Sequence, residues 1–138
     1  LDTGPGVGTE EDFEESVDVA ATLAVHSLRT GLDVVVRTTH REHAGRATPV
    51  RSDADVLDLL TSVGRSVDAA PLDIAELFRH GLDHTSMLLV TGPSGPTSRF
   101  ASQDKMVVVR VGDAEYPVNN SSIDRTNWIQ VTVWDFRN

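Results

Sequence analysis

Three short runs of consecutive aliphatic residues most constrain how this chain can fold. They are Val34-Val35-Val36, Met87-Leu88-Leu89-Val90 and Val107-Val108-Val109. An uninterrupted apolar run, in place of an alternating one, is typical of a strand that is covered on both faces. Segments with helical spacing precede the first run and separate it from the second, and such alternation favours a parallel sheet. The sequence therefore predicts the α/β class, with a mostly parallel sheet and helices on both faces.

Helix signals complete the expected order of elements. Thr9 is followed three positions later by Asp12, which predicts a capping box and a helix that Gly31 ends. The middle of this helix is apolar nearly all round, so we expect it to be buried. The other expected elements are a helix over 53–63 capped by Ser52, a helix from Pro71 to Gly81, a helical turn over 96–102, strands over 32–39, 105–111 and 128–134, and irregular segments over 40–51 and 112–125.

Composition limits the possible functions. The 138 residues suit one domain over 1–138, and a formal net charge of −9 disfavours nucleic acid and anionic membranes as partners. The absence of cysteine excludes thiolate metal sites and cysteine nucleophiles. Because Leu1 and Asp2 resemble the end of a strand, we expect an N-terminally truncated piece of a larger protein. We expect this piece to be cytoplasmic, with the full-length protein anchored to a membrane upstream.

The loop over residues 2–9 is the first candidate site, because ligands of open α/β sheets bind beyond the carboxyl ends of the strands. Gly4, Gly6 and Gly8 would expose backbone amides ahead of a helix, which suits an anion. The acidic residues that follow would repel an anion, and the spacing departs from the dinucleotide fingerprint. We therefore interpret this loop as a structural turn, with a phosphate ligand as the alternative.

The loop over residues 91–97 is the second candidate. It contains Thr91, Gly92 and Ser94 but no lysine for a phosphate, and its two prolines lack the N–H groups that a phosphate nest needs. We interpret it as a turn as well, with the same alternative.

The histidines and serines show no catalytic or metal-binding spacing. His40 and His43 are three apart on an expected loop, and His80 and His84 flank a glycine. Neither pair matches the helical spacing of zinc proteases, and no nucleophile elbow is present. We expect these histidines, and His26 on the first helix, to be structural or solvated. The residues thus predict no catalytic residue, no metal ligand set and no cofactor.

The segment from Glu11 to Ala24, followed by Gly31 and Leu32–Thr39, resembles the C-terminal half of the DUF58 family of bacterial proteins. The resemblance covers about residues 1–90 and implies a von Willebrand factor A-like fold, with Asp2 and Thr3 at the end of its first strand. It also implies hydrophobic segments ahead of the domain and a MoxR-type AAA ATPase encoded nearby.

A degenerate metal site is a further implication of the resemblance. Von Willebrand A domains commonly bind proteins through a divalent cation held by an Asp-x-Ser-x-Ser loop, a Thr and a further Asp. Asp2 matches the first Asp, whereas Gly4 and Gly6 stand at the serine positions. Thr91-Gly92-Pro93 stands where the further Asp is expected. The resemblance therefore implies a vestigial site that holds no metal tightly.

Three hypotheses follow for the function. The first is a non-catalytic protein-interaction or scaffold domain that acts with a MoxR-type AAA ATPase. The second is a small enzyme domain that binds a nucleotide or another phosphate ligand through loops 2–9 and 91–97. The third is a structural domain that forms a homodimer through exposed strand.

Overall fold

The computed structural model of the protein describes residues 1–4, 8–38, 48–65, 87–93, 106–112 and 127–131. Helices and strands of both orientations occur within these ranges, which confirms a mixed α/β class. The elements in chain order are α1 (Glu10–Arg29), β1 (Val34–Val36), β2 (Thr48–Val50), α2 (Asp53–Thr61), β3 (Met87–Thr91), β4 (Met106–Val111) and β5 (Asn127–Val131).

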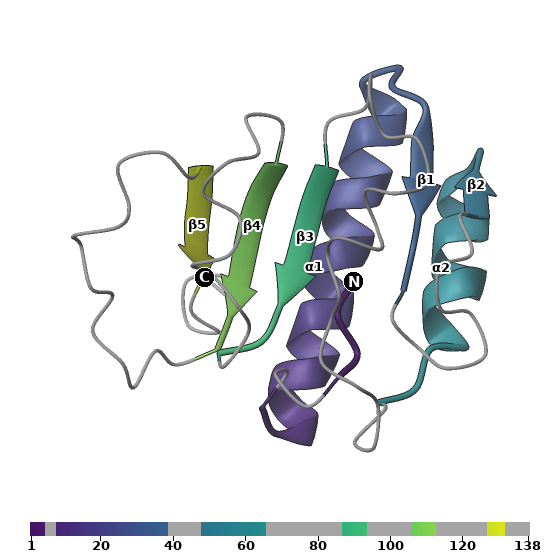
Figure 1. Cartoon of the computed structure of the whole chain (residues 1–138). Helices are drawn as coiled ribbons and strands as arrows, with labels where there is room; N and C mark the ends of the chain where they lie inside the picture. Colours follow the sequence, from purple (N-terminus) through teal and green to yellow (C-terminus); the bar gives the residue numbers. More distant parts are fainter. Residues whose placement is uncertain (5–7, 39–47, 66–86, 94–105, 113–126, 132–138) are drawn as a thin grey trace.

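The strands form two ladders. β3, β4 and β5 pair in parallel in that order, with Val90 opposite Val109 and Val109 opposite Ile129. β1 and β2 pair antiparallel, with Val35 opposite Pro49. In Figure 1 the arrowheads of β1, β3, β4 and β5 point to the end of the molecule where α1 begins, and β2 points the other way. The carboxyl ends of four strands therefore share one edge.

The first two residues connect the two ladders. The amino group of Leu1 donates to the carbonyl oxygen of Arg37 at 2.7 Å, and the N–H of Asp2 donates to the carbonyl oxygen of Val90 at 2.8 Å. Successive backbone donors of an extended segment point to opposite sides. Residues 1 and 2 therefore lie between the end of β1 and β3, and Figure 1 places the N-terminus there.

α1 forms for local reasons that the sequence already shows. The Thr9 hydroxyl accepts a hydrogen bond from the Asp12 N–H at 3.2 Å, and Asp12 Oδ2 accepts one from the Thr9 N–H at 2.8 Å. This capping box satisfies two backbone donors that an uncapped helix leaves without a partner. The helix ends at Arg29, and Gly31 follows with φ +83°, which a residue with a side chain adopts at a cost.

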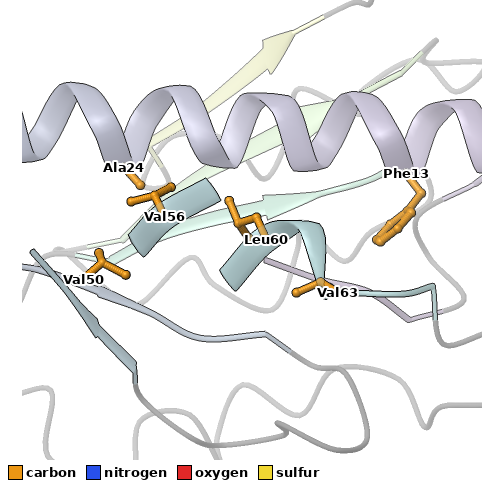
Figure 2. Packing of buried hydrophobic residues seen from close by; sticks show 6 residues of the cluster. All are labelled: Phe13, Ala24, Val50, Val56, Leu60 and Val63. Carbon is orange, nitrogen blue, oxygen red and sulfur yellow. The ribbon is translucent and has the colours of Figure 1, made fainter. Parts of the chain in front are cut away.

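α1 packs on both ladders, and the core is divided accordingly. One cluster, shown in Figure 2, joins α1 to α2 and the β1–β2 ladder; its buried members are Phe13, Ala24, Val50, Val56, Leu60 and Val63. The second cluster joins Val19 of α1 to Val90, Val109 and Val111 of the parallel ladder. Leu1 and Ala20 contact both clusters.

Several boundaries differ from the sequence prediction. The segment 40–51 was expected to be a loop, and this is wrong at Thr48–Val50, which form β2. Pro49 lies in β2, an edge strand in the described ladder, where a missing N–H is tolerated. α2 ends at Thr61 rather than Val63, and β3 extends through Thr91.

Other predicted elements lie outside the described residues. These are the helix from Pro71 to Gly81, the helical turn over 96–102, nearly all of the segment 112–125 and the end of the strand 128–134. Within the described ranges, no helix combines the length and the apolar character that crossing a membrane requires.

Candidate functional site

Asp2 is the centre of the candidate site, which lies at the end of the sheet where the strands β1, β3, β4 and β5 have their carboxyl ends. Its side chain is buried, with 2% of the residue exposed, and both carboxylate oxygens accept hydrogen bonds from the protein. Oδ1 accepts from the Gly4 N–H at 2.9 Å, and Oδ2 accepts from the Thr91 hydroxyl at 2.8 Å. The first bond closes a local turn, and the second ties residues 1–4 to the end of β3.

These contacts bear on whether a divalent cation fits at Asp2. Hard cations bind several oxygen ligands, and a carboxylate must turn at least one oxygen toward the metal. The Asp2 oxygens accept hydrogen bonds from the Gly4 N–H and the Thr91 hydroxyl, and Gly4 contributes an amide donor rather than an oxygen ligand. In the described part of the chain, no three His, Asp or Glu side chains gather closely enough to hold a metal ion. Among the described residues, Asp2 is therefore not part of a cluster of side chains that could hold a metal ion.

The N-terminal end of α1 is closed by the protein itself. Asp12 Oδ2 accepts hydrogen bonds from the N–H and the hydroxyl of Thr9, both at 2.8 Å. Gly8 and Gly112 both lie close to the Asp12 side chain. A Cβ added at Gly8 would lie 2.5 Å from Asp12 Oδ2, and one added at Gly112 would lie 2.8 Å from Asp12 Oδ1. The Pro93 ring would also lie within 3.2 Å of a Cβ added at either glycine. The Asp12 carboxylate and the loops that contain Gly8, Pro93 and Gly112 therefore lie together at the place where the sequence suggested that an anion could bind.

Arg65 connects this edge to the segment after α2. Its Nη2 donates to the carbonyl oxygen of Gly8, and its Nη1 lies 3.7 Å from Glu10 Oε2. The Arg65 side chain is 25% exposed, and its Nε is buried without a hydrogen-bond partner. Arg65 therefore holds the loop ahead of α1 in place from a position far along the sequence.

Two further groups at this edge are affected by burial. Burial lowers the pKa of Arg110, which lies opposite Thr91 in the β3–β4 register. Thr38, after β1, is 5% exposed and its hydroxyl has no hydrogen-bond partner.

The structure brings together only part of what the sequence singled out. Asp2 is hydrogen-bonded to both Gly4 and Thr91. Gly92, which follows Thr91 in the sequence, is buried. Gly6 and Ser94 lie outside the described residues, as do all histidines except His26, which is exposed on α1. Sequence reasoning missed the Asp2–Thr91 bond and the role of Arg65, because both depend on contacts between segments more than fifty residues apart.

Comparison with known proteins identified no relative. No protein-family model, no curated protein and no solved structure matches the chain.

Proposed function

We propose that this chain is a non-catalytic protein-interaction or scaffold domain of von Willebrand A type, belonging to a DUF58-type bacterial protein, and that its partner is a MoxR-type AAA ATPase. The observation that supports this proposal is the hydrogen bonding of the Asp2 carboxylate. The residue stands at the carboxyl edge of the strands, at the start of the loop that leads into α1, and both its oxygens bond to the protein. An Asp2 carboxylate that is hydrogen-bonded within the protein suits a partner interaction that needs no metal at this edge.

Isothermal titration with Mg²⁺ and Mn²⁺ tests the metal part of the proposal. We expect no binding in the micromolar range, because hard cations need several oxygen ligands and no cluster of them surrounds Asp2 among the described residues. The Gly4→Ser/Gly6→Ser double variant restores two hydroxyls and is the matched comparison. Micromolar binding to the unmodified chain that Asp2→Asn abolishes would contradict the proposal.

Surface-based binding to the purified MoxR-type ATPase of the same organism tests the partner. The chain is immobilised, and the ATPase is passed over it with and without EDTA. We expect saturable binding that persists in EDTA. An absence of binding at about 100 µM ATPase, which corresponds to roughly 5.5 kcal/mol, would contradict the proposed partnership.

A thermal-shift series with inorganic phosphate and nucleotides separates this function from the phosphate-binding alternative. We expect no shift, since Asp12 already accepts the hydrogen bonds of the Thr9 cap and its negative charge would repel a phosphate. A dose-dependent rise in melting temperature with phosphate would favour the alternative.

A further inference from the structure

We draw no further inference here: the strongest candidate, the group of buried side-chain atoms without a hydrogen-bond partner at the carboxyl edge of the strands (Arg37 Nη1, Thr38 Oγ1 and Arg65 Nε), adjoins segments outside the described residues, and nothing in the described part of the chain shows that these atoms face a common ligand.

Discussion

The Thr91 hydroxyl ties the first residues of the chain to β3 through a side-chain hydrogen bond to Asp2. Replacing it in Thr91→Val removes a hydrogen bond from a carboxylate whose residue is only 2% exposed. We expect the free energy of unfolding to fall by about 1–3 kcal/mol, the usual penalty for a buried polar group that loses its partner. Urea unfolding measures this change. Thr91→Ser keeps the hydroxyl and should lose less; a serine variant less stable than the valine variant would contradict the assignment.

Gly8 and Gly31 allow the cost of backbone strain to be compared with the cost of a steric clash. Gly8 (φ +78°) and Gly31 (φ +83°) share the left-handed conformation, but only Gly8 has neighbours within 4 Å of an added Cβ. Gly31→Ala should cost about 1 kcal/mol, from strain alone. Gly8→Ala should cost clearly more, because its Cβ would lie 2.5 Å from Asp12 Oδ2 and 2.9 Å from Pro93 Cγ. Equal thermal stability of the two variants would show that the loop ahead of α1 relaxes freely.

At the scale of one element, α2 depends on its capping box. The Ser52 hydroxyl accepts from the Asp55 N–H at 3.1 Å, and Asp55 Oδ2 accepts from the Arg51 N–H at 2.9 Å. The Arg51 backbone hydrogen bond, with help from Ser52, holds the pKa of Asp55 below its ordinary value. A carboxyl whose pKa is lowered by folding stabilises the folded state above its ordinary pKa, and this contribution disappears as the pH falls through the folded value.

Asp55→Asn tests this contribution by its pH dependence. We expect the variant to be less stable than the unmodified chain at pH 7 and the difference to narrow as the pH falls below about 4. Chemical unfolding followed by circular dichroism at a series of pH values measures it. Ser52→Ala is the companion variant and should lose about 1 kcal/mol at neutral pH. A difference that stays constant down to pH 2 would rule out the Asp55 carboxylate as the source.

At the scale of the whole molecule, α1 joins the two ladders through two core clusters. Val56 of α2 is fully buried in the first cluster. The two tryptophans are Trp128, which lies in β5 of the parallel ladder, and Trp134, which follows it in the sequence, so their fluorescence reports on a different part of the chain. Val56→Ala should lower the free energy of unfolding by about 2 kcal/mol. If the ladders unfold together, tryptophan fluorescence and circular dichroism should report the same lowered midpoint. The neighbouring Leu57→Ala, at an exposed position, should change little. Midpoints that separate would show two independent units.

Local signals account for the elements that were predicted well. Thr9 with Asp12 and Ser52 with Asp55 form the capping boxes that their spacing indicates, and Gly31 follows the end of α1. The three aliphatic runs lie in β1, β3 and β4. β2 was missed because Thr48–Val50 is short and carries Pro49 on an edge strand, so nothing in its own residues distinguishes it from a loop. Its pairing with β1 decides its conformation.

The sequence by itself determined where α1 and α2 begin and which aliphatic runs form strands, because capping and side-chain periodicity act between residues a few positions apart. Its prediction that the strands are covered on both faces is wrong for β1 in the described structure, where Val35 is 52% exposed. The sequence also showed Asp2 at the start of a loop that has glycine at positions 4 and 6. Only the tertiary structure decided what Asp2 does. Its partner Thr91 is 89 residues away and is brought near by the meeting of the strand ends, and burial then favours a carboxylate whose oxygens are bonded within the protein.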